Sequence, residues 1–374
     1  MAAEIWENQH ILKRERGVTK LNRHEKAMEL LLDGTIIPAT PLALTEERSF
    51  DERTQRTLMR YYLDAGAGGI ATAVHSTQFA IRKPEHKLFE PIIKLVSEEI
   101  SEYERKNHKV VVKICGVCGE KEQAVSEAVL ARENGYDAVL LSPGGLNHLS
   151  EHEFLERAKA VADEMPIIGF YLQQAVGGKR FSYEFWKKFC EIPNVAAIKC
   201  ASFDRYTTID VVRAVAFSNR KDQITLYTGN DDNLLIDLLT PYCFTENGVT
   251  YEARFRGGLL GHWCVWTKRA VELFEEVKMI SNTDEIPAWL LTKAAEITDI
   301  NGAFFDVAHD FAGCISGLHE ILRRQGIFKN TLCLDPEEGL SMGQIEEIDR
   351  VYRLYPEWND DAFVAENLAT WVKG

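Results

Sequence analysis

The sequence predicts a (β/α)8 TIM barrel with an N-terminal extension and an appended C-terminal helical region. Eight short apolar, β-branched runs recur along the first two thirds of the chain. Amphipathic segments with helix start and stop signals separate these runs. No GxGxxG pattern follows the first run, which disfavours an open dinucleotide-binding sheet. Strands that alternate with helices in this way favour a closed parallel barrel.

The eight runs are the predicted strands, and most of them are apolar on both faces, as is typical of strands covered by helices. They span residues 34–40, 69–74, 109–115, 137–141, 166–171, 195–199, 224–227 and 258–263. Between the runs, Ser49 and Ser150 are each followed three residues later by glutamate, a capping-box pattern at a helix start. Gly66 and Gly135 supply helix stops before the next strand.

The predicted elements divide the chain into three regions. Residues 1–33 form a mostly polar extension that ends in a helix, residues 34–280 form the catalytic barrel, and residues 281–374 form the C-terminal helical region. We expect this last region to pack on the barrel or on a neighbouring subunit. The connection 240–256 is unusually long and precedes the eighth strand, so we expect it at the N-terminal face, where stability or subunit contacts are more common than chemistry.

Composition narrows the class of protein. The chain has 374 residues, 45% hydrophobic and 27% charged, with a net charge of −14, which argues against nucleic acid or an anionic membrane as a main partner. It has no apolar stretch long enough to span a membrane and no apolar core of a signal peptide near its N-terminus, so we expect a cytoplasmic protein. The eight cysteines are scattered along the chain, which is typical of reduced thiols in a protein core. The pair Cys115 and Cys118 could also form a redox couple. We expect no metal and no cofactor.

The carboxyl ends of the strands are the expected location of the site, because TIM-barrel enzymes place their chemistry there. Small hydroxyl and amide side chains dominate these positions. Besides Lys199 and Tyr171, the candidates are Thr40, Ser76, Thr77, Gly229, Asn230 and His262, which we predict to bind substrate.

Lys199 ends the sixth apolar run, where its ammonium group has to leave water if the strand is buried. Burial disfavours the charged form and can lower a lysine pKa from ~10.4 toward ~7 to 8. The neutral amine can then attack a carbonyl and form a Schiff base. Tyr171 ends the neighbouring fifth run, and a phenol beside the amine can relay the protons that this chemistry moves. The alternative is a lysine that extends its head group to solvent.

Four segments together resemble the dihydrodipicolinate synthase / N-acetylneuraminate lyase family. They are the first strand with its Pro-Ala-Thr-Pro end at 38–41, the strand-end segment 75–79, the pair 170–171, and the lysine segment 192–199 followed by Ser202. The resemblance extends over about residues 33–280. It implies a class I, Schiff-base-forming lyase that acts on pyruvate or a related 2-keto acid and commonly assembles as a homotetramer. By matching positions, Lys199 would form the imine, Tyr171 would relay protons, and Ser76 with Thr77 would hold the keto-acid carboxylate.

The chain also departs from the family pattern. The usual Gly-Thr-Thr-Gly-Glu turn is His-Ser-Thr-Gln-Phe at 75–79, and Leu-Gln-Gln follows Tyr171 where Asn-x-Pro is usual. The arginine that binds the second substrate in synthases would fall near Val176. These changes argue against a role in lysine biosynthesis. They favour an uncommon, sugar-derived second substrate. The Lys199 imine would then serve aldol cleavage or condensation, or dehydration, of a 2-keto-3-deoxy acid. The alternative is a catalytically silent barrel that serves as a ligand-binding or scaffold protein.

Two further side chains have open roles. Lys113 lies within the third strand; pointing inward it would be a rival amine, and pointing outward, which we favour, it would extend past a helix. His262 at the end of the eighth strand is either a second acid or base, or a histidine hydrogen-bonded within the barrel rim.

Overall fold

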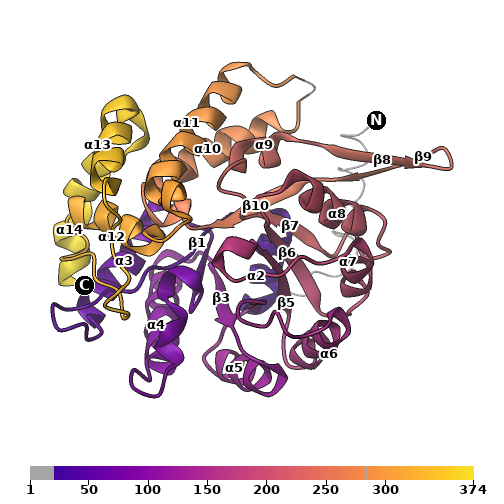
Figure 1. Cartoon of the computed structure of the whole chain (residues 1–374), viewed down its shortest axis with the longest axis horizontal. Helices are drawn as coiled ribbons and strands as arrows, with labels where there is room; N and C mark the ends of the chain where they lie inside the picture. Colours follow the sequence, from indigo (N-terminus) through magenta and orange to yellow (C-terminus); the bar gives the residue numbers. More distant parts are fainter. Residues whose placement is uncertain (1–20, 284) are drawn as a thin grey trace.

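The computed structural model describes residues 21–283 and 285–374, and it shows the predicted barrel (Figure 1). Eight parallel strands form one sheet in the order β1-β10-β7-β6-β5-β4-β3-β2. A parallel bridge between Ala39 and Ala71 joins the ends of this order, so the sheet closes on itself. The predicted (β/α)8 fold is therefore confirmed.

The barrel strands overlap the eight apolar runs, but the eighth strand begins at Phe255 and ends at Leu260, so His262 lies in a short helical turn after it and not at the predicted strand end. The strand residues are almost all buried because helices cover the outer face and side chains fill the interior. The strands are β1 (Ile36–Pro38), β2 (Gly69–Thr72), β3 (Val112–Val117), β4 (Ala138–Leu141), β5 (Ile167–Leu172), β6 (Val195–Ala201), β7 (Thr225–Thr228) and β10 (Phe255–Leu260).

The outer ring consists of α3 (Glu52–Ala65), α4 (Phe89–Asn107), α5 (Lys121–Glu133), α6 (Glu151–Ala162), α7 (Tyr183–Cys190), α8 (Arg205–Ala216), α9 (Leu234–Leu239) and α10 (Thr267–Ile280). The predicted capping box at Ser150 is present at the start of α6. The one predicted at Ser49 is wrong. Helix α3 begins two residues later, where the Asp51 carboxylate accepts a hydrogen bond from the backbone amide of Thr54.

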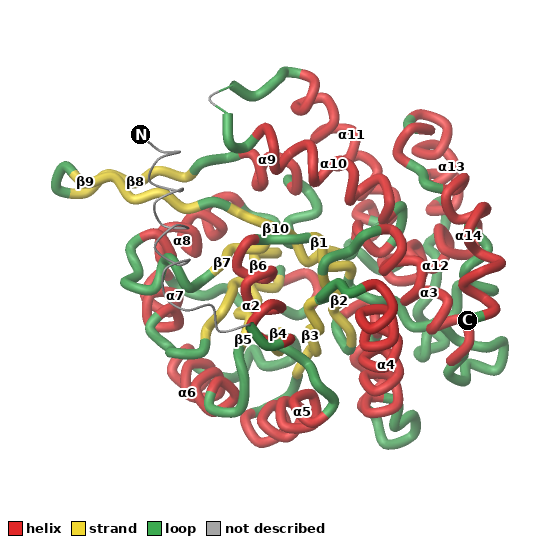
Figure 2. The backbone as a smooth tube through the Cα atoms, turned by 180° about the vertical axis from the view of Figure 1, so that it is seen from behind, coloured by secondary structure: helices red, strands yellow, loops and turns green. Residues whose placement is uncertain are grey.

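Helix α2 (Arg23–Asp33) corresponds to the helix predicted at the end of the extension and contacts β3, β6, β7 and β10 (Figure 2). Its last residues precede β1, so α2 closes the N-terminal end of the barrel. Residues 1–20 of the predicted extension lie outside the described part of the chain.

The long connection before the eighth strand forms a β-hairpin of β8 (Tyr242–Glu246) and β9 (Val249–Ala253) that projects from the barrel (Figure 1). The hairpin packs on the outer ring where the ring of Tyr251 lies 4.8 Å from that of Phe217, at the end of α8. Its base lies beside Asp33, at the N-terminal face. A role in subunit contacts stays a prediction.

The C-terminal region contains α11 (Trp289–Phe304), α12 (Cys314–Arg324), α13 (Gln344–Leu354) and α14 (Asp361–Lys373). It packs on the barrel along α3, next to which α14 runs in both views (Figures 1 and 2). The Tyr61 hydroxyl donates a hydrogen bond to the Asp360 carboxylate at 2.7 Å, and Arg60 donates one to the Trp371 carbonyl at 2.6 Å. Among the described residues, no helix is both long and apolar enough to cross a membrane.

Candidate active site

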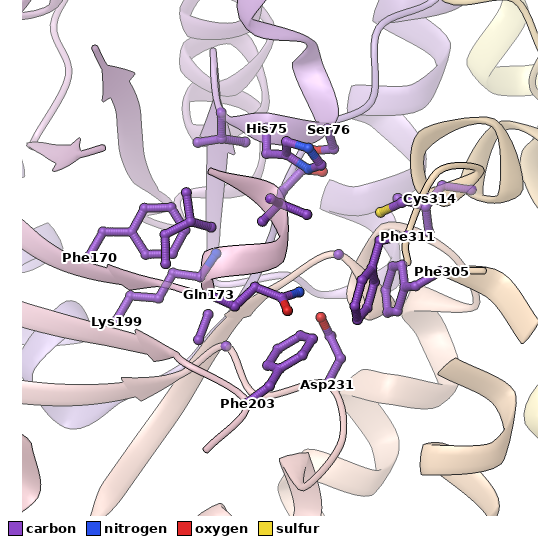
Figure 3. A pocket seen from close by; sticks show the side chains of 18 residues that line it. His75, Ser76, Phe170, Gln173, Lys199, Phe203, Asp231, Phe305, Phe311 and Cys314 are labelled. Atoms are coloured by element: carbon purple, nitrogen blue, oxygen red, sulfur yellow. The ribbon is translucent and has the colours of Figure 1, made fainter. Parts of the chain in front are cut away.

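A pocket opens at the carboxyl ends of the strands and is shown in Figure 3. It encloses a cavity volume of about 80 Å³. The strands contribute Lys199 of β6 and Phe170 of β5, while the segments after β2 and β7 contribute His75 and Asp231. The pocket therefore lies where the barrel fold predicts the chemistry.

Lys199 is buried in the wall of this pocket with 8% of its surface exposed. Its amine points into the cavity and lies 4.4 Å from the centre of the Phe170 ring (Figure 3). Burial lowers the pKa of Lys199, while the negative charge of Asp231 and the Cys264 thiol oppose this shift. The result is an amine that loses its proton more readily than a lysine in water does.

Gly229, directly after β7, leaves room for the lysine. A Cβ atom on Gly229 would lie 2.6 Å from Cε of Lys199 and 2.9 Å from Cβ of Ala201. These distances are too short for carbon atoms in contact, so a glycine is needed where the lysine side chain passes. Gly229 lines the pocket, and its predicted role in substrate binding stays a prediction.

The structure does not bring Tyr171 to Lys199, so its expected place beside the amine is wrong. Lys199 pairs in register with Phe170, and Tyr171 pairs with Cys200 on the opposite face of the sheet. The Tyr171 ring packs against Phe181 and Trp186, outside the barrel, and its hydroxyl oxygen accepts a hydrogen bond from the Phe181 amide at 3.4 Å. The residue that faces Lys199 on β5 is thus a phenylalanine without a hydroxyl group.

Of the three predicted hydroxyl residues near β1 and β2, only Ser76 lines the pocket. Its hydroxyl donates a hydrogen bond to the Ala39 carbonyl. Thr77 faces away, is fully buried, and donates to the Thr40 carbonyl at 2.7 Å. Thr40 is also fully buried outside the pocket lining. The short helical turn His75–Thr77 rotates successive side chains in different directions, so the two adjacent hydroxyls cannot both face the ligand.

Asn230 and His262 also lie outside the pocket lining. The Asn230 carboxamide accepts a hydrogen bond from the Phe203 amide and donates one to Asp237 at 2.9 Å, which holds the segment after β6. His262 shares a 2.6 Å hydrogen bond with Asn301 of α11, and burial lowers the pKa of His262 to about 4. His262 therefore belongs to the rim that joins the barrel to the C-terminal helices.

Asp231 is the residue that the strand-end search missed, although it follows Gly229 and Asn230 directly in the sequence. It lines the pocket, and its Oδ1 atom is shielded from solvent without a hydrogen-bond partner among the described residues. Burial raises the pKa of Asp231, while the positive charge of Lys199 opposes the shift. Lys199 and Asp231 are thus an amine and a carboxyl group in one cavity, and burial shifts the pKa of each in the direction of its neutral form.

Two more polar side chains line the cavity. Burial, with a smaller effect of the Lys199 charge, lowers the pKa of His75 to about 4, so its imidazole is neutral. Gln173, after β5, directs its carboxamide into the centre of the pocket (Figure 3). Both stand in segments that the sequence marked as departures from the family pattern.

The C-terminal region supplies part of the wall, which no sequence pattern indicated. Phe305, Phe311, Cys314 and Leu318 all line the pocket, and Figure 3 labels the first three. Burial raises the pKa of Cys314, so its thiol is protonated at neutral pH.

Lys113 is another lysine whose pKa is lowered, and it faces outward. Its ammonium group donates hydrogen bonds to the Ser97 carbonyl at 3.0 Å and to the Ser101 hydroxyl at 2.6 Å, both on α4. Burial and the charge of Arg23 lower the pKa of Lys113 to about 8. Its amine is held against a helix and away from the pocket.

The cysteine pair is unbridged, since all eight cysteines are free thiols. Burial raises the pKa values of both Cys115 and Cys118, which does not favour a reactive thiolate. Within residues 21–283 and 285–374, no group of three or more histidine, cysteine or acidic side chains is arranged to hold a metal ion.

Residues 33–241 match the model of the dihydrodipicolinate synthetase family. The chain belongs to this family. Its members are lyases and aldolases, so this chain is identified with a class of enzymes that process small molecules. A search of curated protein sequences finds no match.

Solved structures related to this family share the fold at low sequence identity. An N-acetylneuraminate lyase from Fusobacterium nucleatum superposes with a TM-score of 0.67 at 17% identity, over 87% of this chain and 99% of the lyase. A dihydrodipicolinate synthase from Bacteroides thetaiotaomicron superposes with a TM-score of 0.68 at 15% identity, over 86% of this chain and 98% of the synthase. Within the dihydrodipicolinate synthetase family, this chain combines a strand-end lysine with a phenylalanine where the resemblance implied a proton-relaying tyrosine.

Proposed function

We propose that this protein is a class I lyase that forms a Schiff base between Lys199 and pyruvate or a related 2-keto acid. The observation that carries the proposal is the buried Lys199 amine, which lies in a pocket at the carboxyl ends of the strands and whose pKa burial lowers. Such an amine is partly neutral near physiological pH and can act as a nucleophile. Membership of a family of lyases and aldolases supports the same class of reaction.

The reaction begins when the Lys199 amine attacks C2 of the keto acid. The resulting carbinolamine loses water and becomes a protonated imine, which serves as the electron sink. In the cleavage direction, a base takes the proton of the C4 hydroxyl and the C3–C4 bond breaks. C4 leaves as an aldehyde, and the electron pair of the broken bond moves toward the imine to form an enamine. Protonation at C3 and addition of water then release pyruvate and restore the amine. In the condensation direction, the enamine adds to an aldehyde.

Asp231 is the group that we assign to proton transfer in these steps. It shares the cavity with Lys199, and its raised pKa suits a carboxyl group that both accepts and gives up protons near neutral pH. Phe170 has no hydroxyl with which to do so. Ser76 lines the same cavity, and its hydroxyl would have to turn from the Ala39 carbonyl to donate a hydrogen bond to the keto-acid carboxylate. Dehydration of a 2-keto-3-deoxy acid would use the same imine and the same proton carrier.

Among the described residues that line the pocket there is no tyrosine, which favours one alternative, a barrel that binds ligands without catalysis. The two functions differ in covalent chemistry. Wild-type protein incubated with pyruvate and borohydride should gain the mass of one reduced pyruvate adduct, because borohydride traps the imine. Lys199→Ala should gain none.

Lys113→Met is the matched control for this experiment. Lys113 has a lowered pKa like Lys199, but its amine faces α4, so the adduct should persist in this variant. A wild-type protein without adduct, or a full adduct on Lys199→Ala, would contradict the Schiff-base mechanism. Two expectations stay predictions: that the protein forms a homo-oligomer, with a tetramer expected from the family, and that it is located in the cytoplasm.

A further inference from the structure

The pocket wall opposite Lys199 is aromatic, and the C-terminal region builds much of it (Figure 3). Phe305 follows α11, and Phe311 lies in the loop before α12; both line this wall. Phe203, which follows β6, completes the surface, with its ring centre 5.7 Å from that of Phe311. A ligand bound to Lys199 would extend toward these three rings.

The loop that carries Phe311 is fixed by buried hydrogen bonds. Asp306 is 3% exposed, and its carboxylate accepts hydrogen bonds from the Gly313 amide at 2.9 Å and from the Ser341 hydroxyl. The same carboxylate shares a 2.6 Å hydrogen bond with His309. Gln344 of α13 donates to the Gly313 carbonyl at 3.0 Å. These hydrogen bonds fix the backbone on both sides of Phe311 and so set the place of its ring in the wall.

Two of the three aromatic residues have a backbone conformation that bulky side chains rarely adopt. The φ angles of Phe203 and Phe311 are 51° and 69°, in the left-handed region. Conformations of this kind persist when the surrounding structure enforces them, and they cluster at ligand sites. Here they aim both rings at one pocket (Figure 3).

The same pocket offers few groups for binding several hydroxyls. Its polar side chains are His75, Ser76, Gln173, Lys199 and Asp231, together with the Cys314 thiol. Lys199 and Asp231 are assigned to the chemistry, and Ser76 already donates its hydrogen bond to a carbonyl. Hydroxyls that enter without partners lose their hydrogen bonds to water, which weakens binding. An apolar group that enters loses nothing of this kind and gains contact with the rings.

We propose that the substrate carries an apolar group, aryl or branched alkyl, which binds on Phe203, Phe305 and Phe311. In the cleavage direction this group leaves on the aldehyde, and in the condensation direction it arrives on the aldehyde. The proposal rests on the proposed function, because Lys199 fixes the keto-acid end of the ligand. It differs from the sugar-derived substrate that the departures in sequence suggested.

The test separates recognition of the apolar group from the covalent step. Lys199→Met removes the amine, so binding to this variant reports noncovalent recognition alone. Titration calorimetry would compare benzylpyruvate with 2-keto-3-deoxygluconate. We expect benzylpyruvate to bind about tenfold more tightly or better, in the range by which apolar pockets discriminate.

Phe311→Gly in the same background removes one ring and suits the positive φ angle, since glycine adopts it without strain. It should weaken benzylpyruvate binding about tenfold and sugar-acid binding less. Asp310→Gly is the matched control, because Asp310 precedes Phe311, has a φ of 51°, and does not line the pocket. It should leave both dissociation constants unchanged.

Equal or tighter binding of the sugar acid would overturn the proposal, as would equal losses in Phe311→Gly and Asp310→Gly. Borohydride trapping on the wild-type protein is read separately. If the apolar preference holds but no adduct forms on Lys199, the proposed function fails and the apolar site stands.

Discussion

Gly229→Ala tests how closely the barrel is built around Lys199. The new methyl group would lie 2.6 Å from Cε of Lys199, whereas ordinary contacts between such atoms are 3.4–4 Å. Cε must therefore retreat by at least about 0.8 Å, and the amine bonded to it must move as well. A misplacement of about 1 Å at a reacting atom can cost about 100-fold in rate.

The stability of the fold should fall by a moderate amount. The lysine side chain is flexible and can yield, but Cβ of Ala201 at 2.9 Å and the Cys200 carbonyl oxygen at 3.1 Å are fixed to the backbone. Overpacking of this kind costs about 1–3 kcal/mol of unfolding free energy. The structure therefore predicts a variant that folds and forms the pyruvate imine about 100-fold more slowly.

The assay is the rate of the borohydride-trapped adduct by intact mass, alongside unfolding in denaturant. Gly302→Ala is the matched control, because a Cβ on Gly302 of α11 meets no atom within 4 Å. At this open helix position, the change from glycine to alanine should raise the free energy of unfolding by up to about 1 kcal/mol and leave the trapping rate unchanged. A trapping rate for Gly229→Ala within about threefold of wild type would refute the packing argument.

Three further variants test the proton carrier Asp231, the tyrosine that lies outside the pocket, Tyr171, and the second buried lysine, Lys113. Asp231→Asn removes the negative charge that favours the Lys199 ammonium, so the pKa of Lys199 should fall further. The acid limb of the pH profile of imine formation should therefore move to lower pH, and an acid limb that moves to higher pH would contradict this coupling. Turnover should drop about 10²–10⁴-fold because the proton carrier is lost. Tyr171→Phe should leave turnover unchanged and lower the free energy of unfolding by at most about 1 kcal/mol, because the Tyr171 hydroxyl contacts Phe181 outside the barrel. A tenfold loss of turnover, roughly 1.4 kcal/mol, would show that Tyr171 takes part in catalysis. Lys113 has a pKa of about 8 in the folded protein and 10.5 as its ordinary value, so the unfolded chain binds more protons between these values and wild-type stability gains from rising pH. Lys113→Met lacks this gain, and its stability relative to wild type should fall by about 2–3 kcal/mol from pH 8 to 10.5; a constant difference would contradict the shift.

Much of the barrel is predictable from the sequence because its signals are local. A parallel strand covered on both faces must be apolar throughout, so each of the eight strands appears as a short apolar run. The strand-end rule then points to Lys199 and Gly229, and the structure places both in one pocket. These inferences need only the order of elements, not their exact geometry.

Side-chain direction is not predictable in the same way. Along a strand, successive side chains point to opposite faces, so a shift of one residue exchanges Phe170 for Tyr171. Both residues are aromatic and both are buried, which means that neither composition nor hydrophobicity distinguishes them. The register with Lys199 decides it, and register is a property of the assembled sheet.

The sequence by itself determined the fold class, the family and the lysine, because each rests on a run of neighbouring residues. Only the tertiary structure decided what surrounds that lysine. Asp231 comes to it from the segment after β7, and Phe305 and Phe311 come from the connection between α11 and α12, more than 100 residues further along the chain. Contacts between such distant segments depend on how whole elements pack, and no local pattern encodes them. The chemistry of the nucleophile is therefore readable in one strand, whereas the groups that select its substrate are assembled from separate parts of the chain.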